Sequence, residues 1–177
     1  CQSIASVPIV IGVNSLPATP TISAGGPTTF CSGGSVALTS SAETGYLWSD
    51  GATTASINAT AAGSYTVQVT NASGCQSAAS APIVIVVDAL PTTPTITVGG
   101  PTSFCTGGSV TLTSSAGTSY LWSGGETTSS ITVNTAGNYS VQITNAGGCQ
   151  SLSSAATTVS VYGFPATPTI TAGGPTT

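Results

Sequence analysis

The sequence predicts an all-β chain of tandem antiparallel β-sandwiches joined by short Pro-rich linkers. Three observations predict this fold class: an internal repeat, short segments of alternating apolar and polar residues, and frequent turn residues between them. No helical period is visible, and 22 Gly and 11 Pro among 177 residues disfavour long helices. Short strands separated by turn signals are typical of β-sandwiches.

The repeat has a period of 74 residues. The Cys-Gln-Ser run at Cys1 recurs at Cys75 and Cys149, with offsets of 75 − 1 = 74 and 149 − 75 = 74. Tyr46-Leu47-Trp48 likewise returns as Tyr120-Leu121-Trp122. Self-similarity at a fixed period is typical of repeat architectures. We therefore expect a last strand of a preceding repeat at 1–14, complete repeats at 15–88 and 89–162, and a linker with the first strand of a following repeat at 163–177, as in a window on a longer array.

Within the first repeat, five segments are predicted strands. They are Ser35–Thr39, Tyr46–Ser49, the short edge segment Ala55–Asn58, Tyr65–Thr70 and Ala81–Val87. Alternation places the apolar side chains of the first and fourth segments toward a core. The last segment is almost continuously apolar, which predicts that both of its faces are covered.

The inward positions of the first repeat are Val36, Leu38, Tyr65, Val67 and Val69. The second repeat follows the same scheme with Val110, Trp122, Ile131, Tyr139 and Val141. Turns are expected at Asp50-Gly51 and Asn71–Gly74, because Asp-Gly is a strong turn signal. Leu90-Pro91 with Pro94 marks the linker between the repeats, and Pro-rich linkers are semi-rigid and extended.

The charge composition excludes several function classes. The chain contains no Lys, Arg or His, and its four carboxylates give a net charge of −4. It therefore lacks the cations that bind nucleic-acid phosphates and the commonest general base and metal ligand. No apolar run is long enough for a transmembrane helix. We expect no catalytic residue, cofactor, metal, nucleic-acid partner or membrane insertion.

The carboxylates themselves do not form a candidate site. None of Glu43, Asp50, Asp88 and Glu126 is matched by an acidic residue in the other repeat. A calcium cage or a glycosidase pair needs several converging carboxylates. Solvated turn positions are the simpler interpretation.

The motifs of each repeat resemble those of a known family. Each repeat reads F-C-x-G-G-S-V-x-L-T, then Y-L-W-S, then G-x-Y-x-V-Q-[VI]-T-N-A-x-G-C-Q-S. These motifs resemble the immunoglobulin-like repeats of large secreted surface proteins of Bacteroidota-type bacteria, including adhesins. Tyr65 and Tyr139 resemble the tyrosine corner of such sandwiches. The resemblance departs from antibody domains in lacking their inter-sheet cysteine pair.

The five cysteines suggest disulfides, as in secreted β-proteins. The equal spacings, 75 − 31 = 44 and 149 − 105 = 44, favour the pairs Cys31–Cys75 and Cys105–Cys149 within the repeats. A covalent link between neighbouring repeats, from Cys31 to Cys149, remains open. In a strict sandwich, the segment of Cys31 lies at the pole opposite the final turn.

Two functions from different classes follow from these features. The first is a structural repeat of an extracellular filament or of a cell-surface adhesin stalk, with other copies of itself as partners. Its uncharged edge strands lack the Lys residues that normally prevent edge pairing. The alternative is a glycan-binding or spacer module of a secreted multidomain protein, in which Trp48 and Trp122 contact surface glycans. Trp48, Tyr65, Trp122 and Tyr139 are predicted core aromatic residues, which favours the first function.

Overall fold

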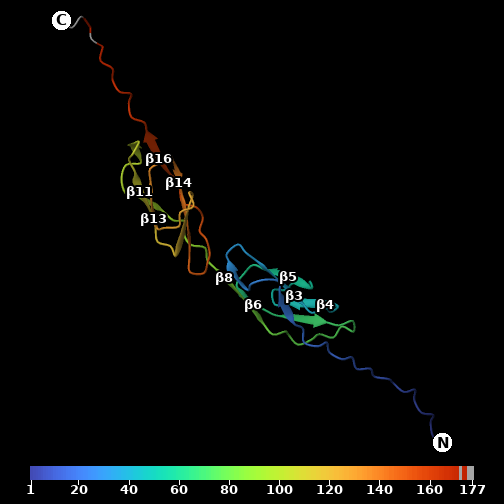
Figure 1. The fold of residues 1–177 in the computed structure, drawn as a ribbon. Helices are drawn as coiled ribbons and strands as arrows, with labels where there is room; N and C mark the ends of the chain where they lie inside the picture. Colours follow the sequence, from blue (N-terminus) through green and yellow to red (C-terminus); the bar gives the residue numbers. More distant parts are fainter. Residues whose placement is uncertain (172, 175–177) are drawn as a thin grey trace. The chain divides into compact units, whose positions relative to one another are not determined.

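All regular secondary structure in the described residues is β, which confirms the all-β prediction (Figure 1). The computed structural model describes residues 1–171, 173 and 174. The chain divides into two compact units, Cys1–Asp88 and Ala89–Thr177. No helix in the described part of the chain is long and apolar enough to cross a membrane.

The first unit contains eight strands. They are β1 (Ile22–Ala24), β2 (Thr29–Cys31), β3 (Val36–Ser40), β4 (Gly45–Trp48), β5 (Ser56–Ala59), β6 (Gly63–Tyr65), β7 (Val67–Thr70) and β8 (Ile83–Asp88). The strand orders are β1-β3-β5, β2-β8-β6 and β4-β7. Because β6 and β7 are separated only by Thr66, the last two groups share one stretch of chain that changes partner from β8 to β4.

The core lies between the group that contains β3 and the groups that contain β4, β7 and β8. Alternation along β3 buries Val36 and Leu38 and exposes the residues between them. These two side chains pack in one cluster with Trp48, Val67 and Ile85. Two β-layers that bury one apolar face each against the other form a sandwich.

Two details of the first unit differ from the prediction. The stretch expected as one strand at 65–70 is divided at Thr66, whose backbone carbonyl accepts a hydrogen bond from Ser49 N–H (2.9 Å). Strand β2 pairs with β8 in parallel, with Cys31 opposite Asp88, whereas the other strand pairs of the unit are antiparallel. Parallel strands need a long connection between them. Strands β3 to β7 lie between β2 and β8 in the sequence and supply that connection.

The prediction that both faces of β8 are covered is wrong. Ile85 is buried, but Val84 is 60% exposed and Val86 is 44% exposed. Successive side chains of a strand point to opposite faces of its sheet, and only one face of β8 meets the core. In the second unit the corresponding outward residues are Thr158 and Ser160.

The second unit repeats the element order of the first. Its strands are β9 (Ile96–Val98), β10 (Ser103–Cys105), β11 (Val110–Ser114), β12 (Ser119–Trp122), β13 (Ser130–Val133), β14 (Gly137–Tyr139), β15 (Val141–Thr144) and β16 (Thr157–Tyr162). The orders are β9-β11-β13, β10-β16-β14 and β12-β15. The predicted inward residues Val110, Trp122, Ile131 and Val141 are buried in one cluster, with Tyr139 packed against it.

Two segments that match strands in the repeat alignment form no strand here. Residues 1–21 carry no regular structure, and Ile9 and Ile11 are exposed although they align with Ile83 and Ile85 of β8. β8 is held by β2 on one side and β6 on the other. Residues 1–14 have no such neighbours among the described residues, so their backbone groups are not paired in a sheet. Residues 163–171 also form no strand, and the remaining expected strand residues 172 and 175–177 lie outside the described part.

Candidate functional site

Trp48 and Trp122 are core residues, as predicted. Each is 2% exposed, at the end of β4 and β12 respectively. Each indole Nε1–H donates a 2.8 Å hydrogen bond to a backbone carbonyl, that of Thr54 or Thr128. A buried indole usually finds a partner for its N–H. Neither ring presents a face on which a sugar could stack.

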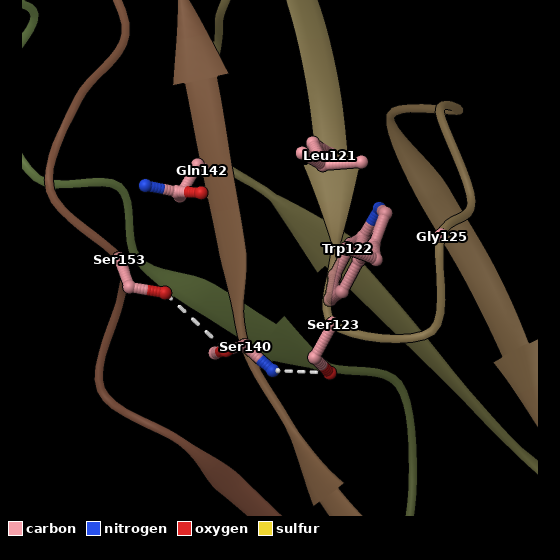
Figure 2. Close-up of a pocket in the computed structure, with 7 residues that line it drawn as sticks. All are labelled: Leu121, Trp122, Ser123, Gly125, Ser140, Gln142 and Ser153. Atoms are coloured by element: carbon pink, nitrogen blue, oxygen red, sulfur yellow. Dashed lines mark hydrogen bonds between the residues drawn. The ribbon is translucent and has the colours of Figure 1, made fainter.

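A surface hollow of about 340 Å³ lies beside Trp122 in the second unit (Figure 2). It is lined by Leu121, Trp122, Ser123, Gly125, Ser140, Gln142 and Ser153. Figure 2 shows three of these serines joined by hydrogen bonds: the Ser153 hydroxyl donates to the Ser140 hydroxyl (3.3 Å), and Ser140 N–H donates to the Ser123 hydroxyl (3.2 Å). The polar lining consists of hydroxyl and carboxamide groups.

This hollow does not assemble a catalytic arrangement. An activated serine needs a neighbouring base, and no His, Lys, Asp or Glu is among the lining residues. In the first repeat, Thr66 and Ala79 stand where the second has Ser140 and Ser153. The hydroxyl–hydroxyl bond of Figure 2 is therefore a property of one repeat, whereas the other bond recurs in the first repeat, where Thr66 N–H donates to the Ser49 hydroxyl (3.2 Å).

Tyr65 and Tyr139 form the expected tyrosine corners. The Tyr65 hydroxyl donates to the carbonyl of Ala61 (3.1 Å), and the Tyr139 hydroxyl donates to that of Thr135 (3.0 Å). Each bond reaches four residues upstream and each ring packs against its core cluster. The hydrogen bond joins the connection between the two β-layers, which contains Ala61 or Thr135, to the strand that follows it, β6 or β14.

The cysteines differ from the favoured pairing. Cys31 and Cys149 are disulfide-bonded, whereas the thiols of Cys1, Cys75 and Cys105 are free. The pairs Cys31–Cys75 and Cys105–Cys149 are therefore not formed. A disulfide is present, but the bonded cysteines do not form either of the expected pairs.

The distance along the sandwich explains this correction. Cys31 ends β2 opposite Asp88, the last residue of β8. Cys75 begins the stretch that leads to β8, along which Ser77 N–H donates to Val69 and Ser80 N–H donates to Val67. The start of β6 lies opposite Ile85, near the end of β8, whereas the end of β7 at Thr70 lies opposite Gln76, so Cys31 and Cys75 are at opposite ends of the unit. Two bonded cysteines need Cα atoms within about 7 Å.

The four carboxylates do not converge, in line with their interpretation as turn residues for Glu43, Asp50 and Glu126. Asp50 accepts a hydrogen bond from Ala52 N–H (3.1 Å) inside its own turn. Asp88 instead ends β8. Among the residues that the structure describes, no cluster of three acidic or cysteine side chains could hold a metal ion.

A repeated asparagine contact was missed by the sequence analysis. The Asn71 amide Nδ2 donates to the carbonyl of Ser15 (2.9 Å), and that of Asn145 donates to the carbonyl of Ala89 (2.9 Å). The carboxamide oxygens accept from the N–H groups of Cys75 (3.0 Å) and Cys149 (2.9 Å). Each asparagine thus joins the segment that enters its unit to the turn before the cysteine. The signal was present in the sequence, because the T-N-A-x-G-C motif recurs in register.

Buried serines form a second repeated feature. The hydroxyls of Ser77 and Ser80 accept hydrogen bonds from Val69 and Val67 N–H, and Ser151 and Ser154 do the same for Ile143 and Val141. These four hydroxyls also donate to the carbonyl of the next residue. They satisfy backbone N–H donors of β7 and β15. An apolar side chain at these positions would offer no acceptor.

No family model matches the chain, and no curated protein matches it. Among solved structures, it is similar to the three N-terminal domains of the highly immunogenic outer capsid protein of bacteriophage RB49, with 21% identity and a TM-score of 0.41 over 81% of this chain and 59% of that one. It is also similar to a chain in the crystal structure of the mouse coronavirus receptor-binding domain complexed with its murine receptor. That similarity has 15% identity and a TM-score of 0.45, over 81% of this chain and 100% of the other.

Proposed function

We propose that the chain is a structural part of an extracellular filament or of a cell-surface adhesin stalk, built from tandem immunoglobulin-like sandwiches on short Pro-rich linkers. Its partners are other copies of itself, and it has no catalytic role. The resemblance to surface-protein repeats of Bacteroidota-type bacteria supports a bacterial source. The disulfide supports an oxidising, extracellular location, because disulfides persist there and are rare in the cytosol.

The observation that carries this proposal is the chemistry of the edge strands. In the first unit β1 and β5 end the order β1-β3-β5, and in the second β9 and β13 end the corresponding order. None of these four strands contains a charged residue. Proteins normally protect such edges with charges, above all Lys. Uncharged edges leave backbone donors and acceptors able to pair with another copy.

The glycan-binding alternative depended on exposed tryptophans. Both indoles are buried and hydrogen-bonded, so they offer no stacking surface. Among the residues that the structure describes, no other observation favours a sugar site. The structural function is therefore the better supported of the two.

Electron microscopy of the oxidised chain at physiological salt tests the proposal. Regular fibres with an axial spacing of one or two units are expected. Asn58→Lys places a cation on an exposed position of edge strand β5 and should disperse them, because like charges would meet at each contact. Thr39→Lys is the matched control, since Thr39 is exposed on central strand β3, which already has partners on both sides. Dispersed flexible particles of the unsubstituted chain would contradict self-association and leave a passive spacer.

A further inference from the structure

The two edge strands of one β-layer carry matching tripeptides in each unit. In the second unit, β9 (Ile96–Val98) and residues 131–133 of β13 both read I-T-V. In the first unit, β1 (Ile22–Ala24) reads I-S-A and residues 57–59 of β5 read I-N-A. Each tripeptide therefore has Ile first, a polar residue in the middle and an aliphatic residue last. The two members of a pair lie on opposite sides of a central strand, β11 or β3.

The two edge strands run in the same direction and present the same positions to the core. β9 and β13 are each antiparallel to β11, so they are parallel to each other. The buried Leu112 of β11 lies opposite Val98 on one side and opposite Ile131 on the other. Directly opposite residues lie on the same face of a sheet. The aliphatic residues of both edges therefore face the core side, and Thr97 and Thr132 face away from it. The first unit has the same arrangement around β3.

The backbone groups that β9 offers at its free edge follow from its pairing with β11. In an antiparallel pair, successive residues direct their N–H and carbonyl groups alternately toward the partner strand and away from it. Gly99 N–H donates to the Thr111 carbonyl (2.9 Å), so odd-numbered positions of this stretch bond to β11. The N–H and carbonyl groups of Ile96 and Val98 therefore point to the free edge. The equivalent bond of Gly25 in the first unit (2.8 Å) gives β1 the same pattern.

The free edge of β13 offers fewer groups than that of β9. Ser114 N–H donates to the Ser129 carbonyl (2.9 Å), so positions 129, 131 and 133 bond to β11. The groups of Ser130 and Thr132 point outward. The Ser130 carbonyl already accepts a hydrogen bond from the Thr128 hydroxyl (2.6 Å), and β5 has the same cap on its first carbonyl. The N–H and carbonyl of Thr132 are the uncapped pair at this edge.

We propose that β13 of one copy of the chain pairs in parallel with β9 of a second copy, and that β5 pairs with β1 in the same way. Thr132 lies opposite Thr97 of the second copy, so that Thr132 N–H donates to the Ile96 carbonyl and Val98 N–H donates to the Thr132 carbonyl. The identical tripeptides then bring Ile to Ile, Thr to Thr and Val to Val on matching faces, and such cross-strand pairs stabilise a sheet. This inference rests on the proposed self-association and identifies its surface and register.

Pairing of unlike edges also gives an open assembly. An interface between two different surfaces repeats from copy to copy and generates a filament when the rotation does not close. Neighbouring strands rotate by about 20–25°, so a three-stranded layer turns each added copy by roughly 60–75°. Pairing of like edges fits less well. Two antiparallel copies of β9 bring Ile96 opposite Val98, and two copies of β13 centred on Ile131 bring the capped Ser130 carbonyl into the ladder.

Charges at the four outward middle positions test which edges meet. The Lys/Glu variant carries Ser23→Lys and Thr97→Lys on one edge of each layer, with Asn58→Glu and Thr132→Glu on the other, and it keeps the net charge of −4. The matched all-Lys variant carries Lys at the same four positions, which brings the net charge to −4 + 4 = 0. Sedimentation should pellet the Lys/Glu variant as fibres like the unsubstituted chain, because Lys meets Glu at each contact. The all-Lys variant should stay in the supernatant, because like charges directly opposite each other destabilise a strand pair.

The outcomes separate this inference from the proposed function. Pairing of like edges would bring Lys to Lys and Glu to Glu in the Lys/Glu variant, so dispersal of that variant overturns the edge assignment. Fibres of the all-Lys variant also overturn it, while self-association stands. An unsubstituted chain that stays dispersed contradicts self-association itself and removes the edge pairing with it. All four positions are exposed, so the substitutions leave the cores unchanged.

Solid-state NMR of the unsubstituted chain measures the register without any variant. Copies labelled with nitrogen-15 and copies labelled with carbon-13 are assembled together, so that every transfer between the two isotopes crosses from one copy to another. We expect transfer from the Val98 amide nitrogen to the Thr132 carbonyl carbon, and from the Thr132 amide nitrogen to the Ile96 carbonyl carbon. Transfer between Ile96 and Val98 in place of these signals would indicate pairing of like edges. Fibres without transfer at β9 or β13 would place the contact elsewhere, and either result overturns the proposal.

Discussion

The Asn71 side-chain amide donates a 2.9 Å hydrogen bond to the carbonyl of Ser15, 56 residues earlier in the chain. Asn145 makes the same contact with Ala89, again across 56 residues. The other end of each carboxamide accepts from the backbone of the turn before the cysteine. One side chain thus determines where the incoming segment meets each unit.

Substitution of Asn71 should loosen this attachment. Asn71→Ala removes the donor to Ser15 and the acceptor for Cys75 N–H, and it should lower the free energy of unfolding by about 1–2 kcal/mol. Asn71→Asp keeps the acceptor for Cys75 N–H but turns a carboxylate oxygen toward the Ser15 carbonyl, which repels it, so its loss should be no smaller. Denaturant titration measures both. A nearly neutral Asn71→Asp variant would show that the bond to Ser15 contributes little.

Burial of the tryptophans predicts a low collisional quenching of fluorescence. Acrylamide should quench the native chain weakly and the unfolded chain several-fold more strongly, since both indoles are 2% exposed. Strong native quenching, together with protection by a polysaccharide, would restore the glycan-binding alternative.

Replacement of Trp48 should unfold most of the first unit. Trp48→Ala leaves a large cavity, and such changes cost about 3–5 kcal/mol. Trp48→Phe retains most of the volume but leaves the Thr54 carbonyl without its indole donor, so a smaller loss is expected. Calorimetry of the two variants should rank them in this order; a Trp48→Phe variant as unstable as Trp48→Ala would mean that the hydrogen bond outweighs packing.

Buried serines of the first unit should respond oppositely to removal of their hydroxyls. Ser40 Oγ is buried with no hydrogen-bond partner, so Ser40→Ala should be neutral or stabilise the unit by up to about 1 kcal/mol. Ser77 Oγ accepts from Val69 N–H and donates to the Ala78 carbonyl. Ser77→Ala leaves a buried strand donor unpaired and should cost about 1–3 kcal/mol. Urea denaturation of the matched pair decides this; the opposite order would contradict the hydrogen-bond assignment.

The tyrosine corners predict a modest loss when only the hydroxyl is removed. Tyr65→Phe should cost about 1 kcal/mol, because it breaks one bond to a carbonyl and leaves the ring packed. Tyr139→Phe should cost somewhat more, because the Tyr139 hydroxyl also lies 2.8 Å from the Thr135 hydroxyl. Tyr162→Phe is the control, since Tyr162 is 59% exposed. Thermal unfolding measures all three variants. If Tyr162→Phe lowers stability as much as the other two substitutions, the tyrosine corners contribute no more than an exposed tyrosine does.

Much of the core was predictable because it depends on local alternation. Val36, Leu38 and Trp48 lie at positions whose spacing already separates inward from outward faces. The tyrosine corners were expected from the resemblance to immunoglobulin-like repeats, and each of their hydrogen bonds spans only four residues. The exposed face of β8 was not, because a run of apolar residues has the same pattern whether one face or both are covered.

The sequence by itself determined the 74-residue period, the all-β class and the residues of each small core, since these follow from composition and from contacts near in sequence. Only the tertiary structure decided which cysteines are bonded and what Asn71 and Asn145 hold. Both depend on contacts between residues far apart in the chain. Equal spacing suggested that Cys31 and Cys75 pair, but the parallel pairing of β2 with β8 places Cys31 at the end of the unit opposite Cys75. A disulfide forms between sulfur atoms that are close in space, and the length of the intervening sequence does not decide that distance.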